Sequence, residues 1–168
     1  MNVDVFDLAR RAERCGGVIS TRAMARLESA LMVGTEATVD YTWEGFIDAR
    51  QRPAARLQLK ARLSLPCTHC DQPVPFELDT QRAYYFVRDE RALEAIAVED
   101  GEEEPLVGST HFDLAALIED ELILALPIAP RHDACQHQIE AAEEAVAEDP
   151  DARQRPFVVL EGFKPRRG

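Results

Sequence analysis

The sequence predicts an α+β fold in which an antiparallel β-meander packs against one core helix. Residues 36–44, 56–65 and 74–87 alternate apolar and polar side chains, which is typical of strands with one buried and one solvated face. Residues 114–126 instead repeat apolar side chains at helical spacing and end before Pro127. We expect short N-terminal helices, acidic segments and a basic C-terminal tail around this centre.

Length and composition indicate a single domain, because 168 residues of which 46% are hydrophobic can bury a core of ordinary size. We expect a helical segment at 1–34, the sheet and core helix at 35–139, and an acidic helix with a basic tail at 140–168. The sequence has no apolar run near the ~20 residues that cross a bilayer, and no signal-peptide core at its start. These features predict a cytoplasmic protein without a membrane partner.

The N-terminal segment predicts one or two short helices. Phe6, Leu8 and Ala9 are candidates to face the core, whereas the pair Gly16–Gly17 interrupts the helical pattern. A second helix is expected to begin near Ser20 or Thr21, since the hydroxyl of either residue suits a helix N-cap.

The solvated face of the middle strand is basic. Arg56, Lys60 and Arg62 lie on it, and the two flanking strands carry acidic residues on the same face. These acidic residues are Glu36, Asp40, Glu44, Glu77 and Asp79. Two interpretations are open: cross-strand ion pairs, each contributing about 0.2–1 kcal/mol, or a basic stripe that faces RNA.

The whole chain is acidic, with a net charge of −12. A protein that neutralises phosphates needs clustered Lys and Arg, so this balance disfavours a simple nucleic-acid binder and favours cationic partners. The stretch 89–104 predicts a solvated loop with a short helix near residues 91–95, or an acidic arm for such a partner. A second acidic stretch, 140–151, is followed by a basic tail in which Arg166 and Arg167 could contact RNA.

The predicted core helix begins after Asp113, a suitable N-cap, and carries three consecutive carboxylates. Glu119, Asp120 and Glu121 diverge by about 100° each, so they do not form a shared metal site for catalysis. Glu121 falls within the apolar stripe, where an unpaired carboxylate is costly. It should pair with an Arg or a backbone N–H, or be shared with a bound partner, and we treat all three carboxylates as partner-binding candidates. No nucleophile–base pair is evident, which predicts a protein that is not an enzyme and has no small-molecule substrate.

A Cys-x-x-Cys pair and a His-x-x-Cys pair predict a metal site. Cys67 and Cys70 occupy the turn between the second and third strands, and His132 and Cys135 follow an extended segment after the core helix. A Cys₃His set suits tetrahedral zinc, so a structural zinc ion is possible. A redox pair or two plain thiols at a turn are the alternatives. His69 and His137 are spare ligand candidates, and Cys15 is a leftover thiol. These last three residues are not part of the set.

Three stretches resemble the YceD family of large ribosomal RNA subunit accumulation proteins. They are CTHCDQPVPFEL, FDLAALIEDELILALPIAPRHDAC and RPFVVLEGFK, and the similarity extends from about Leu57 to Lys164. Weaker similarity covers FDLARRAERCGGVIS. The resemblance implies a non-enzymatic role in the synthesis, processing or accumulation of 23S rRNA. Many relatives carry a fuller cysteine cluster after the helix than the single Cys135 with His132 found here.

The family's gene often lies beside that of a small basic large-subunit ribosomal protein, and two mechanisms follow. In the first, the chain is an acidic adaptor or chaperone for a basic large-subunit ribosomal protein. In the second, it binds large-subunit rRNA directly through the basic strand face (Arg56, Lys60, Arg62) and the Arg166–Arg167 tail. The charge balance favours the first mechanism.

Overall fold

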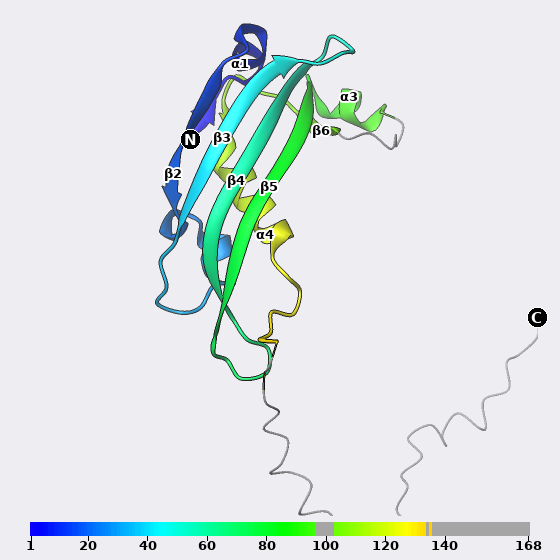
Figure 1. Cartoon of the computed structure of the whole chain (residues 1–168). Coiled ribbons are helices and arrows are strands. Elements are labelled where there is room, and N and C mark those ends of the chain that lie inside the picture. The colour runs from blue at the N-terminus through cyan, green and yellow to red at the C-terminus, as the bar shows by residue number, and fades with distance from the viewer. Residues whose placement is uncertain (97–102, 134, 136–168) are drawn as a thin grey trace, which may run out of the picture. The chain divides into compact units, whose positions relative to one another are not determined.

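A five-stranded sheet forms the centre of the computed structural model, which describes residues 1–96, 103–133 and 135 (Figure 1). The strands follow the order β2–β3–β4–β5–β6, and the first four pair antiparallel. Their bounds are β2 Arg14–Ser20, β3 Thr38–Ile47, β4 Pro53–Pro66, β5 Pro73–Val87 and β6 Glu103–Val107. The predicted α+β class and the three-stranded meander are therefore confirmed.

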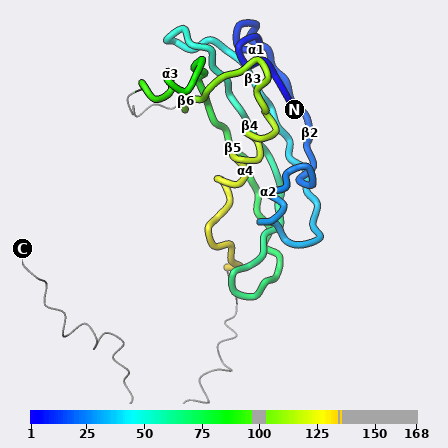
Figure 2. The backbone as a smooth tube through the Cα atoms, turned by 180° about the vertical axis from the view of Figure 1, so that it is seen from behind, coloured from blue at the N-terminus to red at the C-terminus, as the bar shows by residue number. Residues whose placement is uncertain are grey.

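Helices cover only one face of this sheet. Seen from behind, α4 and α2 lie across the sheet, whereas the opposite face carries no helix of the described part of the chain (Figures 1 and 2). The helices are α1 Val5–Arg11, a 3₁₀ turn Thr21–Ala23, α2 Ala25–Glu28, α3 Glu90–Glu94 and α4 Leu114–Ala125. Two short strands, β1 Asn2–Val3 and β7 Phe112–Asp113, pair beside them. Within these ranges no helix has the length and apolarity needed to cross a membrane.

The core lies between the sheet and the helices, as the alternation of residues predicts. All five apolar positions of β4 from Leu57 to Leu65 are buried, and the positions between them are half-buried or exposed. Trp43 on β3 is fully buried, and its ring lies 6.4 Å from that of Tyr84 and 6.3 Å from that of Phe112. Burial of apolar surface in this core, to which the aromatic side chains add their large areas, is the main favourable contribution to folding.

The prediction of helices across residues 14–20 is wrong, because these residues form β2. Residues 14–20 form an edge strand, where we expected glycines to interrupt two helices. Gly16 lies opposite Thr42 in β3, and a Cβ atom at this position would come within 2.7 Å of the Tyr41 carbonyl oxygen. The glycine therefore permits close approach of two strands.

The second correction concerns the acidic stretch after β5. The short helix near residues 91–95 is present as α3, but residues 103–107 form β6 rather than a loop. This strand pairs parallel to β5, so the sheet is mixed rather than wholly antiparallel. Glu103 lies 3.1 Å from the Arg52 guanidinium, which shows that this carboxylate belongs to the sheet rather than to a solvated arm.

Helix α4 agrees with its prediction. The Asp113 carboxylate accepts hydrogen bonds from the backbone N–H groups of Ala115 and Ala116, at 3.1 and 3.3 Å. Leu114, Ile118 and Leu122 are fully buried and join the core cluster. The helix thus packs its apolar stripe on the inner face of the sheet, and the segment that follows it runs on to the β4–β5 turn (Figure 1).

Candidate metal centre

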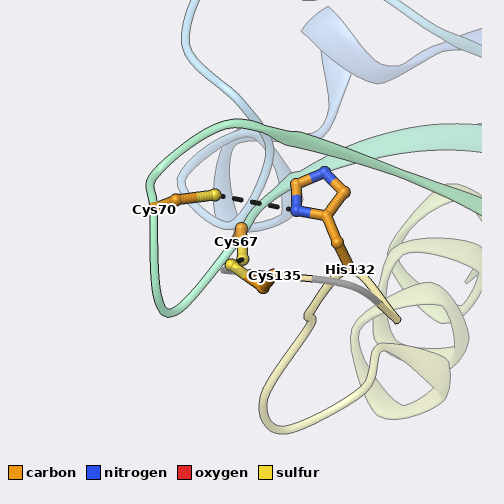
Figure 3. A group of neighbouring side chains, drawn as sticks. All are labelled: Cys67, Cys70, His132 and Cys135. Carbon is orange, nitrogen blue, oxygen red and sulfur yellow. Dashed lines mark hydrogen bonds between the residues drawn. The ribbon is translucent and has the colours of Figure 1, made fainter. Parts of the chain in front are cut away.

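The structure brings the four predicted ligands together at the end of the β4–β5 hairpin. Cys67 and Cys70 come from the hairpin turn, and His132 and Cys135 from the segment that follows α4 (Figure 3). The four ligand atoms lie within 4.8 Å of one another. Cys67 Sγ is 3.7 Å from Cys135 Sγ, and Cys70 Sγ is 3.7 Å from His132 Nδ1.

Backbone hydrogen bonds fix the turn that carries the two cysteines. The N–H of Cys67 donates to the Gln72 carbonyl at 2.9 Å, and the N–H of Asp71 donates to the Cys67 carbonyl at 3.0 Å. The backbone N–H and hydroxyl of Thr68 donate to the Pro130 carbonyl at 3.0 and 3.2 Å, which joins the turn to the segment after α4. The two halves of the cluster are thus held together by contacts outside the ligands.

The geometry fits a tetrahedral metal ion. Zn–S bonds of about 2.3 Å imply ligand atoms about 3.7 Å apart along the edges of a tetrahedron. The separation of the Cys67 and Cys135 sulfur atoms matches this edge, the four ligand atoms all lie within 4.8 Å of one another, and all four cysteines of the chain are free thiols. His132 Nε2 lies 3.1 Å from the Pro73 carbonyl, so donation of its N–H there leaves Nδ1 unprotonated and directed at Cys70. The cluster can therefore hold a metal ion.

The electrostatic environment favours a thiolate at Cys67. Burial acts to raise the pKa of this thiol, but N–H groups of the backbone at His69, His132 and Cys70 outweigh it and lower the pKa to about 5. Hydrogen bonding to Cys70, followed by burial, raises the pKa of Cys135 to about 11. Cys67 is thus the first ligand ready to bind a metal cation, because the thiolate is the form that coordinates.

Each of the three carboxylates of α4 meets an arginine: Glu119 and Asp120 share Arg26, and Glu121 meets Arg82. Glu119 accepts hydrogen bonds from the backbone N–H groups of Arg26 and Leu27 at 2.7 and 3.1 Å, so it caps the N-terminus of α2. Asp120 pairs with the Arg26 guanidinium at 2.5 Å. Glu121 is 7% exposed and lies 3.5 Å from the guanidinium of Arg82, which confirms that this carboxylate pairs with an arginine.

Replacing Glu119 by alanine should destabilise the protein by about 1–2 kcal/mol, since two backbone N–H groups of α2 lose their acceptor. Urea denaturation measures the change. Burial acts to raise the Glu119 pKa, but hydrogen bonds from the Arg26 side chain and the Leu27 N–H lower it below its ordinary 4.5. The contribution of Glu119 to the free energy of unfolding is therefore complete above pH 4.5 and disappears as the pH falls through the lowered pKa.

Asp120→Ala is the matched control: it breaks an exposed ion pair with the same arginine and should have a much smaller effect. Equal losses for both variants would contradict the capping role.

The basic residues of β4 are paired across the ladder. Arg56 lies 3.5 Å from Glu44, Lys60 lies 2.9 Å from Asp79, and Arg62 lies 3.1 Å from Glu77. The interpretation of this face as cross-strand ion pairs is thus confirmed. The tail residues Arg166 and Arg167, the acidic stretch 140–151 and the spare ligand His137 lie outside the described residues.

Comparison with known proteins finds a matching family model and several matching relatives. A family model described as "Large ribosomal RNA subunit accumulation protein YceD" matches residues 55–164. A protein of Haemophilus influenzae named large ribosomal RNA subunit accumulation protein YceD is 25% identical over 164 residues, which cover 95% of this chain and 92% of the relative. No solved structure matches the chain.

Proposed function

Because the chain belongs to the YceD family of large ribosomal RNA subunit accumulation proteins, we propose that it supports accumulation of 23S rRNA in the cytoplasm as a non-enzymatic adaptor or chaperone. Its client would be a basic protein of the large ribosomal subunit. An acidic chain can screen the charge of such a client until it meets rRNA. With a net charge of −12, this chain has the required sign.

The observation that carries this proposal is the pairing of the cations on β4. Each of Arg56, Lys60 and Arg62 already has a carboxylate within 3.5 Å. A phosphate that bound them would have to compete with these carboxylates and would meet their repulsion. A basic client would also have to displace cations from their carboxylates, but the five carboxylates on this face outnumber its three cations, so the net charge attracts such a client.

Direct binding of rRNA is the second candidate. It is favoured by the position of the three cations, which lie along one strand on the face that no described helix covers. In this mechanism the phosphates of the rRNA would replace the carboxylates as partners of the three cations, and Arg166 and Arg167 would add further contacts.

Of the α4 carboxylates, we propose Asp120 as a partner contact, since its side chain is 50% exposed whereas those of Glu119 and Glu121 are 12% and 8% exposed.

We further propose that Cys67, Cys70, His132 and Cys135 hold a structural zinc ion. With four protein ligands the site would be closed to substrate, so the ion would act as a cross-link. It would fasten the β4–β5 turn to the segment after α4, in addition to the hydrogen bonds from Thr68 to Pro130. The ion would thereby fix one end of the sheet.

A pull-down distinguishes adaptor from RNA binder. The tagged full chain is incubated with proteins and rRNA separated from large subunits, with and without ribonuclease, and washed with increasing salt. We expect a small basic ribosomal protein to be retained after ribonuclease treatment. Retention of rRNA with no ribosomal protein would contradict the adaptor. Conversely, if Arg56, Lys60 and Arg62 are neutralised together and 23S rRNA accumulates normally, direct contact through this face is wrong.

A further inference from the structure

The face of the sheet that no described helix covers is hollowed. The hollow lies over β3, β4 and β5, in the part of the sheet that leads to the β4–β5 turn and the metal centre. This hollow, here the sheet trough, has a volume of about 900 Å³. Its charged lining consists of Glu36, Asp40, Lys60, Arg62, Glu77 and Asp79. A smaller hollow of about 340 Å³ shares Glu36 and Arg62 with it and continues to Pro73 and Pro75 beside the metal centre.

We propose that the sheet trough is the docking surface for an extended, Lys- and Arg-rich segment of the client protein. This proposal rests on the proposed adaptor function, and it adds the surface that binds the client and the extended conformation of the bound segment. Its first support is that the surface is large, concave and left open by every helix of the described chain (Figures 1 and 2).

The charge of the trough supports a cationic occupant. Four of its six charged residues are carboxylates. Lys60 and Arg62 neutralise Asp79 and Glu77, and Arg22 lies 3.1 Å from Glu36. Asp40 is exposed, and among the described residues it has no ion pair, although it lies opposite Lys60 in the ladder. The trough thus offers at least one carboxylate that needs no exchange of partners.

The spacing of the carboxylates favours an extended segment. Glu77 and Asp79 are two residues apart on β5, so they project from the same face about 7 Å apart. Alternate residues of an extended peptide have the same spacing. A segment with Lys or Arg at every second position can therefore meet both carboxylates at once, whereas a helix places neighbours on one side at three- and four-residue intervals.

Reversal of the Asp40 charge tests the assignment. The probes are the ribosomal protein retained in the pull-down and a synthetic peptide of alternating Lys and Ser, each measured by fluorescence anisotropy. We expect Asp40→Lys to weaken both by roughly three- to tenfold, since an attraction becomes a repulsion. Glu28→Lys makes the same change at an exposed residue of α2, on the helical side of the molecule, and should leave both affinities unchanged.

Removal of the two cations gives an effect of opposite sign. In Lys60→Gln/Arg62→Gln the carboxylates Asp79 and Glu77 lose their partners, so the client and the peptide should bind several-fold more tightly. Weaker binding of the client and the peptide by this variant would show that the trough is not a site for cations. If the variant loses rRNA binding instead, the direct RNA mechanism is favoured.

Two failures can be told apart. If the wild-type chain retains no ribosomal protein, the adaptor function fails and the docking surface fails with it. If the wild type binds its client but Asp40→Lys binds equally well, the adaptor stands and the trough is the wrong surface. All altered side chains are exposed, so circular dichroism and melting temperature should match those of wild type and exclude misfolding as a cause.

Discussion

Substituting Cys67 by serine should reduce zinc affinity by at least about 100-fold, since loss of a second-shell contact alone costs about 10–100-fold. Cys67 is the fully buried member of the ligand set and the thiol whose pKa is lowered to about 5. A serine hydroxyl stays protonated and is a poor ligand for zinc. The variant should also melt at a lower temperature, because metal that binds only the folded chain stabilises it by mass action. Metal content of protein purified under reducing conditions, and competition with a chromophoric chelator, measure the two effects.

Cys15→Ser is the matched control. This thiol lies on β2 outside the ligand cluster, so its loss should leave both metal content and chelator competition unchanged. A chelator should lower the melting temperature of the wild type and of Cys15→Ser towards that of Cys67→Ser, and leave Cys67→Ser itself unaffected. A metal-to-protein ratio near zero in freshly purified wild type would contradict the zinc site altogether.

The parts of the fold that the sequence predicted are those fixed by local patterns. In β4, alternate residues from Leu57 to Leu65 face the core, and that period is visible in the sequence without knowledge of any neighbour. The start of α4 is equally local, because the Asp113 side chain caps amides only two and three residues away. Local rules therefore identified the three central strands and the helix that packs on them.

The missed strands depend on partners that are distant in the sequence. β2 contains two glycines, which have low strand propensity, and it forms because they allow close approach to β3. β6 contains a proline and two glutamates, and its pairing with β5 is accompanied by ion pairs from Arg52 and Arg82. Neither arginine is close to β6 in the sequence. Strand pairing of this kind cannot be read from composition.

For the candidate metal centre, ligand spacing predicted which residues could bind, but not that they would meet. A helix of 12 residues is about 18 Å long, and the residues after it must cover the remaining distance to the hairpin turn. Because β4 and β5 are long, their turn lies beside the segment that follows α4. Hydrogen bonds from Thr68 to the Pro130 carbonyl join the two. Likewise, the sequence predicted an Arg or a backbone N–H as the partner of Glu121, but could not identify Arg82 on β5.

Replacing Gly45 by alanine should destabilise the fold by about 2–3 kcal/mol, in the upper part of the range for overpacked sites. Gly45 lies on β3 beneath α1, and a Cβ atom there would be 2.5 Å from the Leu8 carbonyl oxygen and 2.8 Å from the Ala9 nitrogen. Both contacts are with helix backbone, which cannot rotate aside as a side chain does. α1 would have to move outwards, which would expose Val5 and loosen the hydrogen bond from the Gly45 N–H to the Glu13 carbonyl. Urea denaturation should show the loss, with a melting temperature lowered by roughly 10 °C.

Gly17→Ala isolates the cause of this loss. It makes the same change in a strand of the same sheet, and the atoms nearest its new methyl group belong to the side chain of Tyr41, the first of them at 3.3 Å. That side chain is partly exposed and can shift, so we expect a change of at most about 1 kcal/mol. If the two variants were equally stable, α1 would have to sit further from β3 than its close contact at Gly45 requires. A large loss for Gly45→Ala alone identifies helix–strand proximity, rather than the general replacement of a strand glycine, as the reason that glycine occupies position 45.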